Sequence, residues 1–305
     1  MADITLKDLG PDMLVRLGEE FLRAGNHAVA RGLFQAAWQE GSHTTSTASR
    51  IGLLAQPTAS TAKLLETLQL VEQIGSDAFV GDGLATWNKT VPSLEDPRFR
   101  ELAERHANLL PLANWHWNLG VVAWAAQQAK SLPGDFVELG VFRGHTSLFV
   151  AELVGFSTWP KTWRLYDTFD GIPDHQVDPG WAEKNAILYR NTFSFEEVRD
   201  RFAHIANVKV IKGQVPEVLE DEPPGAIAFM HMDLNNAAAE IAALDRLYEH
   251  IVPGGVIVFD DYCWAVSKAQ HQAEKAWFER RGLAVLALPT GQGVFIKPGS
   301  PPGPQ

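Results

Sequence analysis

The chain has 305 residues, of which 46% are hydrophobic and 21% charged, as is usual for a globular protein somewhat longer than one typical domain. Its formal net charge of −11 argues against nucleic acid or an anionic membrane as the main partner, and its single cysteine, Cys263, excludes a multi-cysteine zinc site and an intramolecular disulfide framework. No basic and apolar leader and no apolar run of about 18 residues is visible, so we expect a cytoplasmic protein without a membrane partner.

Residues 1–105 are expected to form a helical region. Within it, residues 17–38 place large and small apolar side chains at the spacing of one tetratricopeptide-like helix pair. These positions are Leu17, Gly18, Phe21, Gly25, Ala30, Phe34 and Ala37. One period later only Gly52 recurs in register, so an array of repeats is not predicted. Because a single pair buries little apolar surface, we expect it to pack on the rest of the chain, with an independent interaction module as the alternative.

Strand-like and helix-like segments alternate through residues 106–298. Apolar strands are expected at 135–141, 162–167, 207–213, 226–233 and 255–260, and helices at 145–154, 237–251 and 267–282. Residues 283–289 and 293–299 are expected to form an antiparallel hairpin. This order predicts an α/β domain with a doubly wound, Rossmann-like, mostly parallel sheet. The Pro/Gly-rich residues 299–305 are expected to be a disordered tail.

The turn after the first of these strands, VELGVFRGHTS, contains Glu138, Gly140 and Gly144. Glycine at the last two positions would let the backbone approach a ligand and let the next helix pack closely. The middle glycine of a dinucleotide-binding turn is missing, and an acidic residue precedes the first glycine. An acid there would repel a pyrophosphate but suits the ammonium of S-adenosylmethionine (SAM). The turn therefore indicates a SAM site, with a purely structural turn as the alternative.

Two further positions suggest contacts with the rest of SAM. Asp167 ends the second strand, where an acid can accept hydrogen bonds from both ribose hydroxyls. The alternative is that Asp167 caps the turn in DTFDGIP, because aspartate is common at the start of turns. Gly213 and Gln214 follow the third strand, and we expect the edge of the adenine there.

Three carboxylates follow the last two parallel strands: Asp233 after the first, and Asp260 and Asp261 after the second. Carboxyl ends of neighbouring parallel strands meet at one sheet edge, where ligands bind. Such acids repel one another unless a cation neutralises them, and oxygen ligands suit Mg²⁺, with Mn²⁺ or Ca²⁺ as substitutes. In the alternative, Asp261 caps the next helix and Asp260 is solvated. We expect His231 to be hydrogen-bonded within the fold and not to bind the metal.

The motifs PGDFVELGVFRGHTS, LYDTFDGIPD, HMDLN and IVPGGVIVFDDY together resemble the macrocin-O-methyltransferase family over roughly residues 106–297. Its members include enzymes that methylate sugar hydroxyls of macrolide and aminocoumarin antibiotics. The resemblance implies that the turn glycines bind SAM and that Asp233, Asp260 and Asp261 bind Mg²⁺. The family often has D-G-D where this chain has Asp233-Leu234-Asn235. The absence of the second acid makes the identity of the substrate less certain than the binding of the metal.

We therefore expect a SAM- and Mg²⁺-dependent O-methyltransferase that acts on a sugar hydroxyl of a small molecule or glycan. Asp233 is the first candidate for the proton acceptor and His175 the second. Residues 171–194 are expected to cover the acceptor as a lid, with an ordinary surface excursion as the alternative. The alternatives are a metal-dependent catechol or phenol O-methyltransferase and a non-enzymatic SAM-binding scaffold. A dinucleotide oxidoreductase is least favoured. The oligomeric state is left open, with a homo-oligomer as one alternative.

Overall fold

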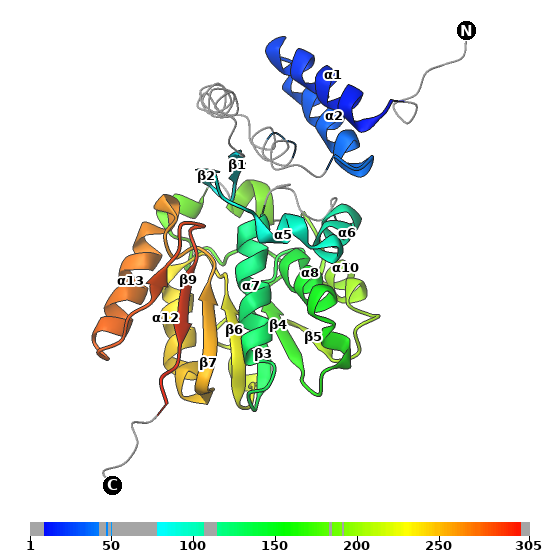
Figure 1. Ribbon diagram of the computed structural model, residues 1–305. Coiled ribbons are helices and arrows are strands. Elements are labelled where there is room, and N and C mark those ends of the chain that lie inside the picture. Colours follow the sequence, from blue (N-terminus) through cyan, green and yellow to red (C-terminus); the bar gives the residue numbers. More distant parts are fainter. Residues whose placement is uncertain are drawn as a thin grey trace. The chain divides into compact units, whose positions relative to one another are not determined.

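The computed structural model describes residues 9–42, Thr47, Arg50, and residues 78–106, 115–182, 185–190 and 192–299. Gly52 and most of the predicted tail lie outside these residues. The chain divides into two compact units, Met1–Asn118 and Leu119–Gln305, which Figure 1 shows in colours that follow the sequence. The division falls within helix α7 (His116–Ala129), beyond the boundary near residue 105 that the sequence suggested.

The predicted helix pair of the first unit is present as α1 (Pro11–Arg23) and α2 (His27–Gln39). Their close approach depends on Gly18, because a Cβ at this position would lie 2.8 Å from the ring of Phe34. Asn26 begins α2 as its N-cap, since its side chain accepts a hydrogen bond from the Val29 amide. Small residues therefore close this pair as expected, while its relation to tetratricopeptide repeats stays a prediction.

A β-hairpin in the first unit was not anticipated from the sequence. Strands β1 (Ala78–Gly81) and β2 (Leu84–Trp87) pair antiparallel and are followed by α5 (Pro92–Glu95) and α6 (Pro97–Arg105). The two-residue turn is Asp82-Gly83, and both residues have positive φ, 51° and 68°. Asp-Gly is a strong hairpin signal for this reason. The Asp82 carboxylate also accepts hydrogen bonds from the Trp117 and Asn118 amides at the start of α7.

A seven-stranded sheet forms the centre of the second unit, with strand order β5-β4-β3-β6-β7-β9-β8. Its strands are β3 (Asp135–Leu139), β4 (Trp163–Asp167), β5 (Val208–Lys212), β6 (Ile227–Met232), β7 (Ile251–Phe259), β8 (Leu286–Ala287) and β9 (Gly293–Ile296). Strands β3 to β7 pair parallel, whereas β9 runs antiparallel to β7 and to β8. The predicted doubly wound sheet with its C-terminal hairpin is confirmed.

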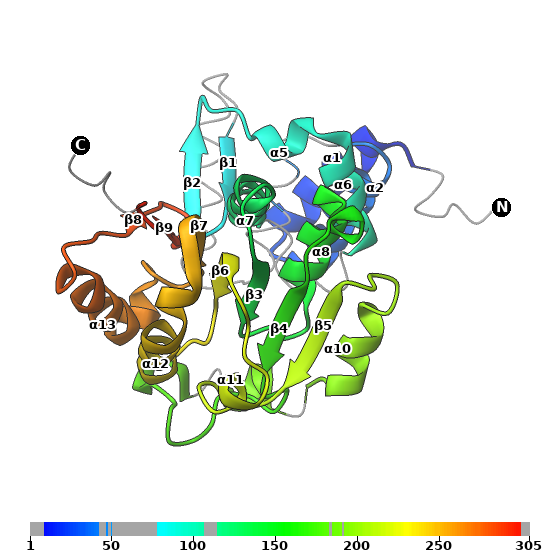
Figure 2. The same cartoon turned by 90° about the horizontal axis from the view of Figure 1, so that it is seen from below.

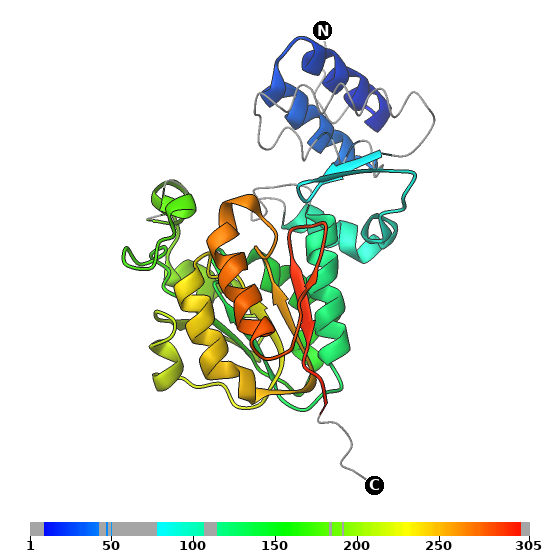
Figure 3. The same cartoon turned by 90° about the vertical axis from the view of Figure 1, so that its left-hand side faces the viewer.

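Helices cover both faces of this sheet. Figures 2 and 3 show α7 and α8 on one face and α12 and α13 on the other. The helices after α7 are α8 (His145–Val154), α10 (Phe195–Arg201), α11 (Val218–Asp221), α12 (Ala237–Leu247) and α13 (Lys268–Glu279). Short helical turns are η2 (Phe156–Thr158), η3 (Pro179–Trp181), η4 (Asn185–Tyr189), η5 (Tyr248–His250) and η6 (Ala265–Ser267). Within the described part of the chain, no helix combines the length and apolarity that a membrane span requires.

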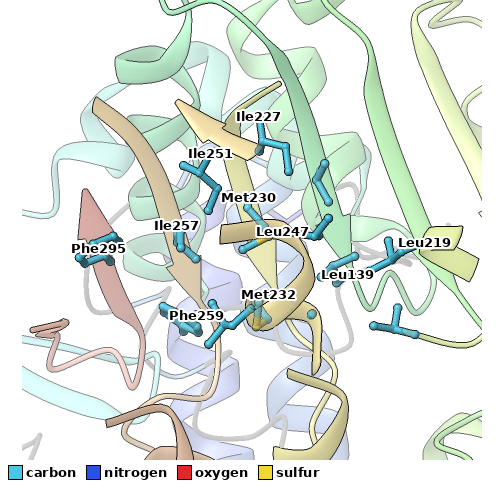
Figure 4. Close-up of a cluster of buried hydrophobic side chains, with 14 of the residues drawn as sticks. Leu139, Leu219, Ile227, Met230, Met232, Leu247, Ile251, Ile257, Phe259 and Phe295 are labelled. Atoms are coloured by element: carbon cyan, nitrogen blue, oxygen red, sulfur yellow. The ribbon is translucent and has the colours of Figure 1, made fainter. Parts of the chain in front are cut away.

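One hydrophobic cluster of the second unit lies between the sheet and helices α12 and α13. Figure 4 shows side chains of β3, β6, β7 and β9 in this cluster, together with Leu247 of α12. All six side chains of β6 are buried, which explains why this strand is a continuous apolar run except for His231. A lone imidazole in such a strand needs polar partners, and it finds them toward the carboxyl end of the sheet.

Candidate active site

The turn after β3 touches the end of β6 directly. Gly140 has φ +86°, and a Cβ placed there would lie 1.9 Å from the carbonyl oxygen of Asp233. The Asp233 amide also donates a hydrogen bond to the Leu139 carbonyl, at 2.8 Å. Glycine is therefore required at position 140 by its conformation and by the neighbouring backbone, whether or not a ligand is bound. The predicted cofactor turn and the first acidic residue form one connected structure.

The other glycines of the predicted SAM site also have packing reasons. Gly144 has φ +74°, and a Cβ there would lie 2.7 Å from the Phe202 ring. At Gly213 a Cβ would lie 2.4 Å from the Val218 side chain. Gln214, which follows it, lies at the end of β5 as predicted. These contacts explain the glycines structurally, so their contact with SAM stays a prediction.

Asp167, at the end of β4, is directed at the turn between β3 and α8. Its Oδ2 accepts hydrogen bonds from the amides of Val141 (2.7 Å) and Phe142 (2.8 Å). Its Oδ1 accepts from the Phe169 amide at 2.7 Å. Burial raises the pKa of Asp167, and these donors offset part of the effect. Asp167 therefore caps its own turn and holds the glycine turn, while its contact with a ribose remains a proposal.

A buried chain of three ionisable groups crosses β3, β6 and β7. His231 Nδ1 lies 3.4 Å from Glu138 Oε1, and His231 Nε2 lies 3.5 Å from Asp260 Oδ1. Burial raises the pKa of Glu138. Burial alone would lower the pKa of His231, but hydrogen bonding to Asp260 and Glu138 raises it well above its usual value. The buried His231 ring thus lies between two acids, with Glu138 Oε1 beside its Nδ1 and Asp260 Oδ1 beside its Nε2. Its expected hydrogen bonding within the fold stays a prediction.

The three predicted aspartates are brought together. Strands β6 and β7 pair with Met232 opposite Phe259, so Asp233 and Asp260 follow at neighbouring positions of the same sheet edge. Asp260 and Asp261 are both buried, with 5% and 7% of their surface exposed. Burial, and then the negative charges of Asp260 and Asp261, raise the pKa of Asp233 well above its usual value. Mutual repulsion of this kind indicates a site built for positive charge.

These carboxylates fit a divalent cation by their chemistry. Such an ion would replace their repulsion with attraction, and oxygen ligands are those that Mg²⁺ prefers. The side chains are not arranged as a finished cage, since among the described residues no three His, Cys, Asp or Glu side chains form a group that could hold a metal ion. Magnesium binding by Asp233, Asp260 and Asp261 is therefore a proposal.

Two amide side chains, Gln292 and Asn235, support the aspartates and were missed from the sequence. Gln292 Nε2 donates to Asp260 Oδ1 at 3.3 Å, and Thr290 Oγ1 donates to Gln292 Oε1 at 3.1 Å. Asn235 Nδ2 donates to Asp233 Oδ1 at 3.0 Å. The signal for Gln292 was a polar TGQG turn between two apolar strands. The signal for Asn235 was an amide where the family often has an acid.

The segment after β4 lies across the carboxyl ends of the strands. Gln176 Nε2 donates to the Val215 carbonyl after β5 at 3.1 Å. Asp178 Oδ2 accepts from the Ala237 amide at the start of α12 at 3.1 Å. Trp181 Nε1 donates to Ser267 Oγ, in η6, at 3.1 Å. Because its three anchors lie beyond three different strands, the segment has the position that a lid over the site requires.

Tyr189, at the end of η4, is a lid residue on which the charges of the acidic site act. Its ring stacks on Trp181 with centroids 6.1 Å apart, and meets Phe142 of the glycine turn edge-on at 5.1 Å. Burial and the negative charges of the three aspartates raise the pKa of the Tyr189 hydroxyl. The lid therefore brings an aromatic wall and a phenol toward the charged end of the sheet.

His175 contacts the residues that follow β5, and its assignment as the second candidate base stays a prediction. Its Nε2 lies 3.2 Å from Gln214 Nε2, at the end of β5. In the sheet, β4 and β3 lie between β5 and β6, the strand that carries Asp233. The lid begins after β4 and crosses β5 first, and this path places His175 on the side predicted for adenine.

The sequence matches the family model Macrocin-O-methyltransferase (TylF) over residues 121–284. One similar curated protein is the 8-demethyl-8-(2,3-dimethoxy-alpha-L-rhamnosyl)-tetracenomycin-C 4'-O-methyltransferase of Streptomyces olivaceus, 28% identical over 44% of this chain and 55% of that protein. Another is the mycinamicin III 3''-O-methyltransferase of Micromonospora griseorubida, 26% identical over 50% of this chain and 63% of that protein. The chain thus spans little more than half the length of the curated relatives it matches.

Two solved structures share the fold. The O-methyltransferase NovP has a TM-score of 0.52 and 22% identity, over 60% of this chain and 80% of its own. The calicheamicin methyltransferase CalS11 has a TM-score of 0.50 and 20% identity, over 66% of this chain and 93% of its own. At these identities both likenesses concern the fold alone.

Proposed function

Because the chain belongs to the macrocin-O-methyltransferase family, we propose that it transfers a methyl group from SAM to a hydroxyl of a sugar carried by a small molecule or glycan. The similar curated proteins are named for methylation of rhamnosyl-tetracenomycin and of mycinamicin, which supports a glycosylated acceptor. The observation that carries the proposal is the convergence of Asp233, Asp260 and Asp261 beside the turn at Gly140.

SAM, when bound, supplies an electrophilic methyl group, and a divalent cation, when bound, lowers the pKa of an acceptor hydroxyl. The residues proposed to hold SAM are Glu138, Gly140, Gly144, Asp167, Gly213 and Gln214, and those proposed to hold Mg²⁺ are Asp233, Asp260 and Asp261. Because the Glu138 carboxylate contacts His231, its proposed effect on SAM is that of a negative charge beside the turn.

Asp233 is proposed to take the proton of the acceptor hydroxyl as its oxygen bonds to the methyl carbon. The carbon–sulfur bond of SAM would break in the same step, and S-adenosylhomocysteine would leave. Its carboxylate is held at Oδ1 by Asn235, and among the described residues no hydrogen bond to its Oδ2 is seen. A carboxylate in this position can act as a general base toward the acceptor hydroxyl. Holding the acceptor oxygen between this base and the methyl group would remove much of the barrier.

The surrounding residues hold this arrangement and exclude water. His231 and Gln292 both contact Asp260 Oδ1, so the orientation of this carboxylate is set from inside the sheet. The lid is tied over the strand ends by Asp178 and Trp181. Exclusion of water strengthens the interactions of the charged groups with the acceptor and prevents loss of the methyl group to water.

The test is transfer of labelled methyl from SAM to a panel of acceptors, with and without a chelator. The panel holds a rhamnosyl glycoside, a simple sugar glycoside and a catechol. Transfer to a sugar hydroxyl supports the proposal, and transfer to the catechol alone replaces it with a phenol O-methyltransferase. SAM binding without transfer to any acceptor would contradict an enzymatic role and support a scaffold.

A further inference from the structure

Two phenylalanines beside Asp167 have a backbone conformation that favours glycine. Phe142, in the turn after β3, has φ 51°, and Phe169, in the turn after β4, has φ 52°. A bulky side chain rarely adopts this left-handed region, and such strain persists only where the surroundings hold it. Asp167 holds both residues, because its Oδ2 accepts from the Phe142 amide at 2.8 Å and its Oδ1 accepts from the Phe169 amide at 2.7 Å.

The ring of Phe142 meets the lid at two places. Its centroid lies 5.1 Å from that of Tyr189 and 4.9 Å from that of Phe193, with interplanar angles of 74° and 85°. Edge-to-face packing at such distances is favourable for aromatic pairs. Tyr189 in turn stacks on Trp181, which donates to Ser267. The backbone of Phe142 thus belongs to the glycine turn, while its side chain belongs to the packing of the lid.

The glycine turn itself does not require a phenyl ring at this position. Phe142 stands where a dinucleotide-binding turn that begins at Gly140 would have its middle glycine. A glycine there would adopt φ 51° without strain. The contacts of the Phe142 ring with the lid therefore offset a cost that the turn alone would avoid, which indicates that the ring serves the contact between turn and lid.

The strained backbone makes this contact conditional. If Phe142 relaxed to a negative φ, the direction of its Cα–Cβ bond would change and its ring would leave Tyr189 and Phe193. A ligand that contacts the turn in its left-handed conformation favours that conformation by its differential affinity for the two states. The lid would then be held when the ligand is bound and released when it is absent.

We propose that Phe142 is a positioning residue that couples occupation of the glycine turn to closure of the lid. SAM at the turn holds the left-handed backbone of Phe142, and the Phe142 ring holds the lid at Tyr189 and Phe193. Because coupling of this kind is reciprocal, a closed lid also tightens binding at the turn. This inference rests on the proposed function, since it takes the glycine turn as the SAM site.

The experiment measures hydrogen–deuterium exchange of the lid with and without saturating S-adenosylhomocysteine, so it needs no acceptor. In the wild type we expect this probe to slow exchange of residues 185–190 by about fivefold or more, as a coupling of ordinary size would. Phe142→Gly suits the left-handed backbone but removes the ring, so it should lose the slowing. Its affinity for the probe, measured by calorimetry, should fall by no more than the same factor. Phe142→Tyr retains the ring and should retain the slowing.

Two further variants separate the contact from the fold of the turn. Phe169→Gly makes the same change at the other left-handed phenylalanine, whose ring contacts among the described residues are with Phe193 and Phe195. This matched control should keep the slowing at Tyr189. Phe193→Ala removes the contact from the side of the lid and leaves the turn intact, so it should weaken the slowing even if Phe142→Gly does not fold.

The inference is overturned if the wild type binds the probe and exchange of residues 185–190 does not change, although the proposed function then stands. It is also overturned if Phe142→Gly, saturated with the probe, keeps the wild-type slowing, or, where that variant does not fold, if Phe193→Ala keeps it. If the wild type does not bind the probe, the proposed function and this inference fail together.

Discussion

The carbonyl oxygen of Asp233 occupies the space in which a side chain at Gly140 would begin, 1.9 Å from the position of its Cβ. The turn predicted to bind SAM and the strand end predicted to hold the acceptor are thus in direct backbone contact. A displacement of one must displace the other. If SAM and the acceptor bind as proposed, this contact fixes the distance between their two sites.

Gly140→Ala should therefore destabilise the fold and impair both SAM binding and methyl transfer. The positive φ and the clash with the Asp233 carbonyl should together cost about 2 kcal/mol or more of unfolding free energy. Thermal unfolding and calorimetric titration with SAM would measure the two effects. Gly225→Ala is the control, since a Cβ at Gly225 meets nothing within 4 Å. Equal stability of the two variants would show that the contact at Gly140 is not made.

A buried acid pair between α12 and α13 predicts how stability depends on pH. Glu240 and Glu274 have no exposed surface, and burial raises the pKa of Glu274 to about 7. The folded chain keeps this proton up to about pH 7, whereas the unfolded chain loses it above the ordinary value of 4.5. The stabilisation is therefore complete below the unfolded pKa and is lost as the pH rises through 7.

Between pH 5 and pH 8.5 the unfolding free energy should fall by an amount on the order of 3 kcal/mol from this group. Glu274→Gln should flatten this part of the profile, because a glutamine cannot ionise. Glu279→Gln is the control on the same helix, since Glu279 is exposed and pairs with Lys275 at the surface. Denaturant unfolding across the pH range measures the slope, and an unchanged slope in Glu274→Gln would rule out ionisation of this pair.

The hydrogen bond between Trp181 of the lid and Ser267 allows a test of the lid's role. Trp181→Phe keeps an aromatic ring beside Tyr189 but removes the donor to Ser267 Oγ. We expect a raised KM for the acceptor and a lower kcat, with a combined loss of about 1 kcal/mol or roughly fivefold in kcat/KM. Trp264→Phe, at an exposed tryptophan, is the control. Steady-state kinetics would decide, and identical constants for the two variants would remove the lid function.

Local signals predicted most elements of the second unit. Helix α8 has the predicted bounds, because Gly144 and Gly155 flank it in left-handed conformations. The C-terminal hairpin is present, but its first strand comprises only Leu286–Ala287 and is shorter than the predicted 283–289. This strand lies at the edge of the sheet and pairs on one side only. The hairpin at Asp82-Gly83 was not predicted, because residues 1–105 were assigned as helical from the pattern of the first forty residues.

The site was predictable only in part, for a physical reason. Asp233 and Asp260 could be placed because parallel strands bring their own carboxyl ends together. The contact of Gln292 with Asp260 joins residues 32 positions apart through an antiparallel hairpin, and no local pattern reports its register. The direction of Asp167 toward the Val141 amide likewise depends on how two turns meet in space.

The acidic trio gives the most direct test of the proposed reaction. Asp233→Asn and Asp260→Asn should each abolish methyl transfer while leaving SAM affinity nearly unchanged, because the aspartates are proposed to act on the acceptor and not on the nucleotide. Loss of a metal-held nucleophile costs several kcal/mol of transition-state stabilisation, which is on the order of a thousandfold or more in rate. Removal of metal by a chelator should have the same effect, and added Mg²⁺ should restore the wild type alone.

Stability supplies an independent readout for the same variants. Without a divalent cation, burial and the charges of Asp260 and Asp261 raise the pKa of Asp233, so Asp233→Asn should relieve repulsion and raise the melting temperature in chelator. Added Mg²⁺ should stabilise the wild type against heat by mass action and should leave Asp233→Asn unaffected. If the aspartates only capped turns, chelator would alter neither rate nor melting temperature. Full activity after verified metal removal would exclude the cation and leave Asp233 as a metal-free base.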